Sequence, residues 1–144
     1  MPEVVFVFTI IRTDFIVKSI KTLYQYTDIE KFRVIIVDQS IEGLDKEWID
    51  KYTHLYIRQK NQGFAQSSNT GLIHGLRWNT PYLAVMNDDL KFIYPTWWED
   101  LLEVFKTDPK IVAVNPFCPK VAMWGYGMTN GEYLEILPYK EQYS

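Results

Sequence analysis

The chain has 144 residues, of which 47% are hydrophobic and 23% are charged, a composition that fits one globular domain and excludes disordered and fibrous proteins. The net charge of −3 argues against a general binder of nucleic acids or anionic membranes, because such proteins normally carry a basic face. The single cysteine, Cys118, excludes an internal disulfide bond and a metal cage built from cysteines.

The segment at the amino terminus, MPEVVFVFTII, has no basic residues before its apolar run and is too short to cross a membrane. We therefore expect a cytoplasmic protein without a transmembrane segment. Aromatic residues make up 16% of the chain. Such residues either fill a core or form a surface that stacks on flat ligands, and composition leaves both interpretations open.

Apolar runs of strand length alternate with stretches of helical spacing along the chain. Runs rich in β-branched and aromatic residues predict strands at residues 4–11, 32–38, 54–58, 81–86 and 111–117. Apolar residues that recur every three or four positions predict helices at residues 14–26, 43–52, 64–78 and 96–105. The strands are continuous apolar runs, which indicates a parallel sheet covered by helices on both faces.

Three of these helices carry more detailed predictions. Thr13 is expected to cap the first helix, and Thr96 followed by Glu99 has the spacing of a capping box at the last one. In the third helix, the residues expected on or near one apolar face are Phe64, Ala65, Leu72, Ile73 and Leu76. Gly71 and Gly75 inside that helix lower its intrinsic stability.

Polar residues lie at or just after the end of each of the first four expected strands. In chain order they are Thr9 and Arg12, then Asp38, Gln39 and Ser40, then Asn61, Gln62 and Gly63, and finally Asn87, Asp88 and Asp89. In a parallel sheet the carboxyl ends of the strands meet at one edge, and α/β proteins bind ligands there. Several converging polar strand ends therefore predict a binding site at this edge.

The residue types at this edge limit the choice of ligand. The first strand–helix turn, TIIRTDF, contains no glycine, which excludes the dinucleotide fingerprint and the phosphate-binding P-loop. Asp88 and Asp89 repel each other, but their oxygen atoms are ligands that suit Mg²⁺ or Mn²⁺ together with substrate phosphates. The pair predicts a divalent cation bridging to a diphosphate, and Asp38 would accept hydrogen bonds from the base or ribose.

Five blocks of the sequence occur in an order that resembles family 2 glycosyltransferases: VFVFTIIRTDF, VIIVDQS, NQGFAQSSNTGL, LAVMNDDL and PTWWEDLLEVF. The resemblance covers roughly residues 4–117. It implies a Rossmann-like GT-A fold, with a mostly parallel central sheet and helices on both faces. It also implies an inverting transfer, dependent on Mn²⁺ or Mg²⁺, of a sugar from a nucleotide-diphosphate sugar to a glycan or another hydroxyl acceptor. A single domain is expected over residues 1–144, with a short acceptor-binding part at about 118–144.

The resemblance also implies roles for individual residues. Asp38 resembles the aspartate that contacts the base, and Asn87-Asp88-Asp89 matches the Asp-x-Asp motif with Asn at its first position. In that match Asp89 is the metal ligand, while Asp88 contacts ribose or a metal-bound water. The residues expected to bind the nucleotide-sugar are Thr9, Arg12, Asp38, Ser40, Asn61, Gly63, Phe64, Asn69, Asn87 and Asp88.

The sequence does not identify the catalytic base that an inverting transferase needs. Glu132 and Glu135, which follow the glycine-rich stretch GYGMTNG, are the candidates. The family's later Gln-x-x-Arg-Trp type motif does not occur. A second hypothesis therefore stays open, in which the chain is a non-catalytic nucleotide-sugar-binding or interaction module. A nucleotidyltransferase is a third, disfavoured by the lack of a glycine-rich and basic first loop.

Overall fold

The computed structural model describes residues 1–114 and 134–136. Within them, one parallel sheet has the order β3-β2-β1-β4, formed by β1 (Val4–Ile10), β2 (Phe32–Asp38), β3 (Leu55–Arg58) and β4 (Tyr82–Met86). A second, short pair joins β5 (Leu90–Phe92) and β6 (Leu134–Ile136) in parallel. The helices are α1 (Asp14–Tyr26), α2 (Lys46–Tyr52), α3 (Phe64–Gly75) and α4 (Trp97–Thr107), and the 3₁₀ turn η1 (Leu76–Trp78) continues α3.

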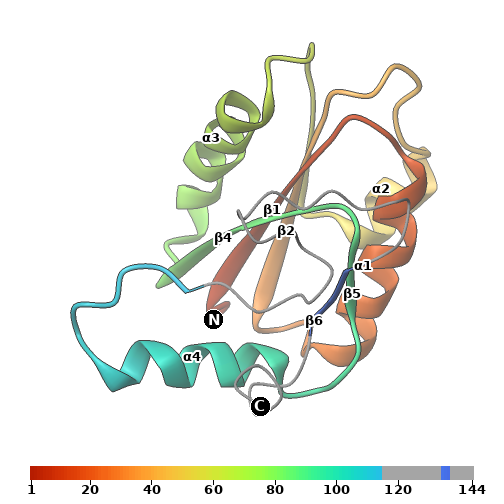
Figure 1. The fold of residues 1–144 in the computed structure, drawn as a ribbon. Helices are drawn as coiled ribbons and strands as arrows, with labels where there is room; N and C mark the ends of the chain where they lie inside the picture. Colours follow the sequence, from red (N-terminus) through yellow and green to blue (C-terminus); the bar gives the residue numbers. More distant parts are fainter. Residues whose placement is uncertain (115–133, 137–144) are drawn as a thin grey trace.

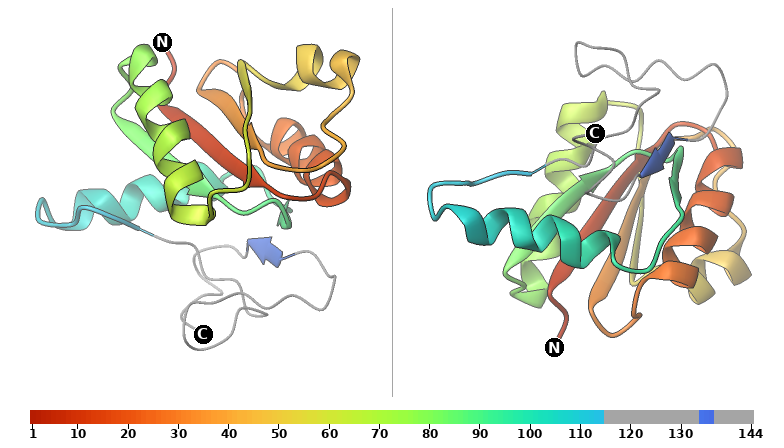
Figure 2. Two further views of the ribbon diagram at one scale, coloured as in Figure 1. Left: turned by 90° about the horizontal axis from the view of Figure 1, so that it is seen from above. Right: turned by 60° about the horizontal axis from the view of Figure 1, so that its bottom comes forward.

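Helices cover both faces of the four-stranded sheet. Side chains of α1 and α4 pack on one face, and α2 adds partly buried residues there, whereas α3 packs on the opposite face. Figures 1 and 2 show this division from three directions. The predicted class, an α/β fold with a mostly parallel sheet and helices on both faces, is confirmed.

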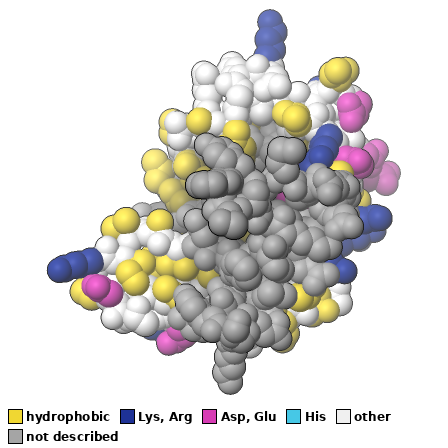
Figure 3. Space-filling view, viewed as in Figure 1, with side chains coloured by type: hydrophobic (Ala, Val, Ile, Leu, Met, Phe, Trp, Pro, Cys, Tyr) yellow, Lys and Arg dark blue, Asp and Glu magenta, His cyan; other side chains and the backbone are white. Residues whose placement is uncertain are grey.

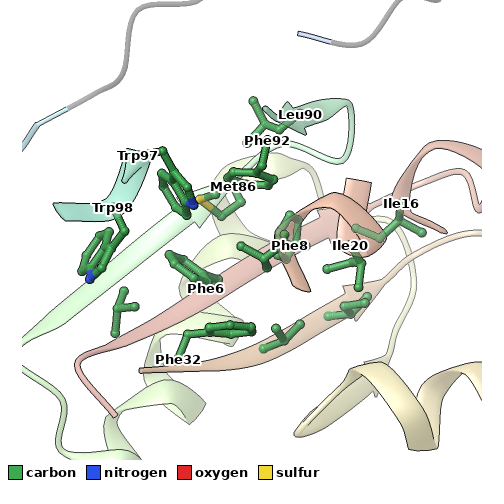
Figure 4. Close-up of a cluster of buried hydrophobic side chains, with 14 of the residues drawn as sticks. Phe6, Phe8, Ile16, Ile20, Phe32, Met86, Leu90, Phe92, Trp97 and Trp98 are labelled. Carbon is green, nitrogen blue, oxygen red and sulfur yellow. The ribbon is translucent and has the colours of Figure 1, made fainter. Parts of the chain in front are cut away.

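The larger core lies between the sheet and the α1/α4 layer and is rich in aromatic rings (Figure 4). The Phe6 ring lies with its centroid 5.6 Å from that of Phe32 and 5.7 Å from that of Trp97. The indole nitrogens of Trp97 and Trp98 donate hydrogen bonds to Thr27 Oγ1 at 2.7 Å and Glu3 Oε2 at 3.0 Å. The rings of these residues therefore fill a core, and the indole N–H groups of Trp97 and Trp98 both have acceptors.

The face of α3 that meets the sheet differs from the predicted one. Its buried residues are small: Ser67, Ser68, Gly71 and Gly75. Phe64, Ala65, Ile73 and Leu76 are exposed, so the predicted apolar face is wrong for them, whereas Leu72 is partly buried against the sheet. The reason is the close approach of the helix to β1, since a Cβ atom built on Gly71 would lie 2.3 Å from Cγ1 of Val7. Large apolar side chains do not fit at that separation, and the glycine that weakens the isolated helix permits the packing.

Gly71→Ala is expected to lower the free energy of unfolding by about 1–3 kcal/mol, the usual effect of overpacking a core, because the stiff Val7 side chain must shift. Gly75→Ala is the matched control. Its added Cβ would come no closer than 3.3 Å to Val5, and alanine favours a helix over glycine by about 1 kcal/mol. Urea denaturation of both variants measures the difference. Equal stabilities would contradict the close approach at Gly71.

Two helix starts are placed correctly but are capped differently from the prediction. Thr13 stands at the N-cap of α1, yet its hydroxyl donates to Glu42 Oε1 at 2.8 Å instead of capping the helix. Thr96 stands at the N-cap of α4 without a capping bond from its side chain, and Glu99 accepts from Lys31 Nζ at 2.9 Å. The predicted Thr13 cap and the predicted capping box are therefore wrong. The side chains of Thr13 and Glu99 form hydrogen bonds with residues distant in the sequence instead of with the helix ends.

Other boundaries also differ from the predictions. The second helix begins at Lys46 rather than at residue 43, because Asp45 caps it by accepting from the Trp48 N–H at 3.3 Å. The third helix ends at Gly75, and η1 then leads to the left-handed residue Asn79. Of the predicted strand 111–117, residues 111–114 form no strand, and the rest lies outside the described residues. β5 was not predicted, since its three residues are too few to show the apolar pattern of a strand.

The helices of the described residues include none that is both long enough and apolar enough to cross a membrane. On the surface that Figure 3 views, the described Lys, Arg, Asp and Glu side chains of both signs are interspersed.

Candidate functional site

The register of the sheet brings the predicted polar segments to one edge. Ile10 lies opposite Asp38, and Asp38 lies opposite Arg58, so β1, β2 and β3 end in line. On the other side of β1, Phe8 lies opposite Met86, the last residue of β4. The chain passes from β1 to β2 on one side and later returns to β4 on the other. The carboxyl end of β1 and β4 is thus a topological switch point, where open α/β sheets bind ligands.

An arginine and an acid pair meet across this switch point. Arg12, just after β1, donates from Nε to Asp88 Oδ2 and from Nη2 to Asp88 Oδ1, both at 3.1 Å. The same Nη2 lies 3.9 Å from Asp89 Oδ2. The hydrogen bond to Asp88 is the main cause that raises the pKa of the Arg12 guanidinium above its usual value, against an opposing effect of burial. The guanidinium therefore offsets the repulsion between the two adjacent carboxylates.

The acid pair stands on a short turn that is anchored in the core at both ends. Met86, before it, and Leu90, after it, are both 7% exposed, and Phe92 in β5 is fully buried. The side chains of Asp88 and Asp89 are only 12% and 9% exposed, while Asn87 is exposed. Core packing thus fixes the backbone that carries the carboxylates. This is the rigid support that a binding site needs.

Asp38, at the end of β2, is fully buried and surrounded by donors from the protein. Its Oδ1 accepts from the Ser40 N–H at 2.8 Å and lies 3.3 Å from Arg58 Nη1. Its Oδ2 accepts from the Tyr56 hydroxyl, which in turn accepts from the Leu44 N–H at 3.1 Å. Burial is the main cause that raises the pKa of Tyr56, and its bond to Asp38 adds to the rise. In this arrangement Asp38 braces the β2–α2 loop, and its predicted contact with a base stays a prediction.

Arg58 completes this brace from the end of β3. Its Nη1 donates to the Ser40 carbonyl at 2.7 Å, and its Nη2 donates to the Ile41 carbonyl at 3.3 Å. The loop passes so close that a Cβ on Gly43, whose φ is +76°, would lie 3.3 Å from Arg58 Cζ. Neither Tyr56 nor Arg58 was predicted from the sequence. Their spacing of two along a strand was a usable pattern, because it places both side chains on one face of the sheet, the face on which Asp38 also lies.

The loop between β3 and α3 also lies at the carboxyl edge of the sheet. Asn61 Oδ1 accepts from the Gly63 N–H at 3.0 Å, and Gly63 has a φ of +87°, which favours glycine. Thr9 shares a 3.1 Å hydrogen bond with the hydroxyl of Ser68, which ties the end of β1 to α3. Phe64 and Asn69 are exposed on α3. Within the residues that the structure describes, Asn69 makes no hydrogen bond to the strand-end residues, so its assignment to a ligand also stays a prediction.

The family model described as glycosyl transferase family 2 matches residues 4–143. The chain belongs to glycosyl transferase family 2. The family predicted from the five sequence blocks is confirmed, and the parallel sheet with helices on both faces is consistent with the Rossmann-like GT-A fold. Among curated proteins, none matches the chain. In general terms the chain is a glycosyltransferase domain, and its class acts on a nucleotide-sugar donor and an acceptor.

The two candidates for a catalytic base in this family 2 domain lie at or beyond the limits of the described residues. Glu132 is outside them. Glu135 belongs to β6, where its backbone lies opposite Lys91 of β5, two residues after Asp89. The pairing of β5 with β6 therefore brings the Glu135 backbone beside the strand that directly follows the acid pair.

The carboxylates of Asp88 and Asp89 in the family 2 domain suit a hard divalent cation that takes only part of its ligands from the protein. Across residues 1–114 and 134–136, no group of three or more His, Cys, Asp or Glu residues could hold a metal ion. Asp88 and Asp89 supply carboxylate oxygens, and Mg²⁺ or Mn²⁺ is commonly held by one or two carboxylates together with water and substrate phosphates. That the pair draws in the Arg12 guanidinium shows that it attracts positive charge.

Proposed function

We propose that this family 2 domain binds a nucleoside-diphosphate sugar at the carboxyl edge of β1, β2 and β4. The sugar is then transferred to a glycan or another hydroxyl acceptor with the help of Mn²⁺ or Mg²⁺. The observation that supports this proposal is the cluster of Arg12, Asp88 and Asp89 across the topological switch point. A diphosphate needs positive charge around it. At the carboxyl ends of β1 and β4, Arg12 supplies such a charge, and two carboxylates could hold a cation that supplies more.

Each element of the edge has a role in this proposal. Asp89, with Asp88 beside it, would hold the cation next to the diphosphate, and the backbone support of Met86 and Leu90 would keep both carboxylates in place. Thr9 and the loop braced by Asp38 form the wall for base and ribose. When bound, the cation would neutralise negative charge that develops on the departing nucleoside diphosphate.

The transfer itself requires a base for the acceptor hydroxyl. Asp38 is poorly suited because protein donors hold its carboxylate, and Asp88 because it would serve the cation. We assign the role to Glu135 or Glu132, with inversion at the sugar carbon as the expected outcome. Glu135 is the stronger candidate, since its backbone lies beside β5. If neither acts, the same edge describes the second hypothesis, a module that binds a nucleotide-sugar without turnover.

Calorimetric titration with UDP, GDP, dTDP and CDP, each with and without Mn²⁺, tests the donor site. One nucleoside diphosphate is expected to bind in the micromolar range and to lose that affinity when the metal is chelated. The matching nucleoside monophosphate is the control, because it lacks the second phosphate and should gain little from Mn²⁺. If none of the four diphosphates binds to the folded protein in either condition, the proposed donor site is wrong. Release of nucleotide from the matching sugar donor then separates turnover from binding alone.

A further inference from the structure

The place where a cation would approach Asp88 is held by a cation of the protein itself. The two hydrogen bonds from Arg12 engage both oxygens of Asp88 at 3.1 Å. The same guanidinium lies between the acids, with Nη2 at 3.9 Å from Asp89. An arginine side chain stays protonated in proteins, so it cannot make room by losing its charge. A divalent ion that reaches Asp88 and Asp89 meets a fixed positive charge unless the guanidinium moves.

The Arg12 guanidinium can move because its contacts with Asp88, Asp89 and the Phe15 ring lie at a partly exposed site. The Arg12 side chain is 42% exposed, and its Cζ lies 3.9 Å from the centroid of the Phe15 ring. Ion pairs with an exposed member are weak and exchange readily, in contrast to fully buried pairs. Asp88, by comparison, is fixed by the anchored turn. The arginine is therefore the partner that leaves when another cation binds.

We propose that Arg12 is an internal counter-ion that competes with the divalent cation for Asp88 and moves onto the diphosphate when cation and nucleotide bind together. The proposal rests on the proposed function and adds the residue that couples its two ligands. Without nucleotide, displacement of Arg12 leaves its guanidinium unpaired, so the cation binds weakly. With nucleotide, phosphate oxygens replace Asp88 as its partner, in the forked geometry that arginine favours. Cation and nucleoside diphosphate therefore strengthen each other's binding, by the same factor in both directions.

The experiment measures Mn²⁺ binding to the protein without nucleotide, from the electron paramagnetic resonance signal of unbound Mn²⁺. Arg12→Met keeps a long, flexible side chain over Phe15 but removes the charge. Its dissociation constant for Mn²⁺ is expected to fall about tenfold, as it would if the guanidinium holds Asp88 about nine-tenths of the time. Arg77→Met is the matched control, because the substitution removes the same net charge. Arg77 also lies near an aromatic ring, with its Cζ 5.6 Å from the centroid of the Trp78 ring. The control should leave Mn²⁺ affinity unchanged.

A second measurement tests the coupling. In the native protein, saturating Mn²⁺ should raise the affinity for the preferred nucleoside diphosphate. In Arg12→Met this enhancement should shrink several-fold, although Mn²⁺ alone binds more tightly. Arg12→Lys keeps the charge but not the fork, so its Mn²⁺ affinity should lie between those of the native and Met proteins. It serves as the second variant if Arg12→Met does not fold by circular dichroism.

Three results would overturn the counter-ion role. They are an unchanged or weaker Mn²⁺ affinity in Arg12→Met, an equal gain in Arg77→Met, and an enhancement by Mn²⁺ that survives loss of the arginine. The proposed function fails differently, by absence of nucleotide binding to the native protein under all conditions. Tighter Mn²⁺ binding by Arg12→Met in that case would still support competition at Asp88 and would overturn the step onto the diphosphate.

Discussion

Replacing Asp38 with alanine is expected to lower the free energy of unfolding by about 2–4 kcal/mol, although the residue lies at the end of a strand. The change leaves the Ser40 N–H, the Tyr56 hydroxyl and Arg58 without their common acceptor. Buried donors without a partner, and one charge of a broken buried pair, account for losses of this size. The value lies below that of a fully buried pair because the Arg58 side chain is 44% exposed.

Urea denaturation of Asp38→Ala beside Tyr56→Phe measures this effect. Tyr56→Phe removes a single hydrogen bond to the same carboxylate and should lower stability by about 1 kcal/mol. If Asp38→Ala loses no more stability than Tyr56→Phe, Asp38 does not organise the loop. Below the melting range, Asp38→Ala should also weaken nucleoside diphosphate binding while its Mn²⁺ binding is kept. Unchanged nucleotide affinity would remove Asp38 and its loop from the donor site.

Replacing Asp89 with asparagine is expected to abolish the part of nucleoside diphosphate binding that depends on Mn²⁺. The affinity for the cation should fall about a hundredfold, because it loses one of its two carboxylates. Asparagine has nearly the shape of aspartate, and Met86 and Leu90 on either side of the turn stay in the core. Stability should therefore change little. The expected signature is a folded protein whose weak, metal-independent nucleotide binding is retained.

Calorimetry with and without Mn²⁺ measures this loss, and Glu103→Gln is the matched control. Glu103 is an exposed acid on α4 paired with Lys106, so the control removes the same charge away from the strand ends. Its Mn²⁺-dependent affinity should equal that of the native protein. Native-like affinity of Asp89→Asn in Mn²⁺ would show that Asp89 is not a metal ligand.

The sequence was sufficient to predict the four strands of the sheet and most helix positions. The two central strands, β1 and β2, are buried on both faces and are therefore continuous apolar runs. β2 and α1 have the predicted bounds, and β1 differs at one end. The face of α3 was not predictable from spacing, since the pattern assumes that large apolar residues meet the sheet. There the separation between Gly71 and Val7 decides the packing, and no local pattern encodes that separation. The caps at Thr13 and Thr96 failed for a related reason, as Glu42 and Lys31 lie far away in the sequence.

The candidate site shows the same limit. Topology alone places the strand ends on one edge, so Asp38 and Asp88 were expected there. Which donors they hold depends on register and on side-chain direction. The pairing of Asp38 with Arg58 follows only once β2 and β3 are aligned, and the bridge from Arg12 to Asp88 follows only once β4 lies beside β1.

The bridge between Arg12 and Asp88 also bears on the order of folding. The two residues are 76 positions apart, and they meet only because the first and last strands of the four-stranded sheet are neighbours. Contacts this distant in sequence close a large loop and form late. A nascent chain would hold β1, β2 and β3 before this edge could exist. A ligand that spans the two segments would bind only the completed sheet, and would then stabilise the native state by mass action as well as serve the reaction.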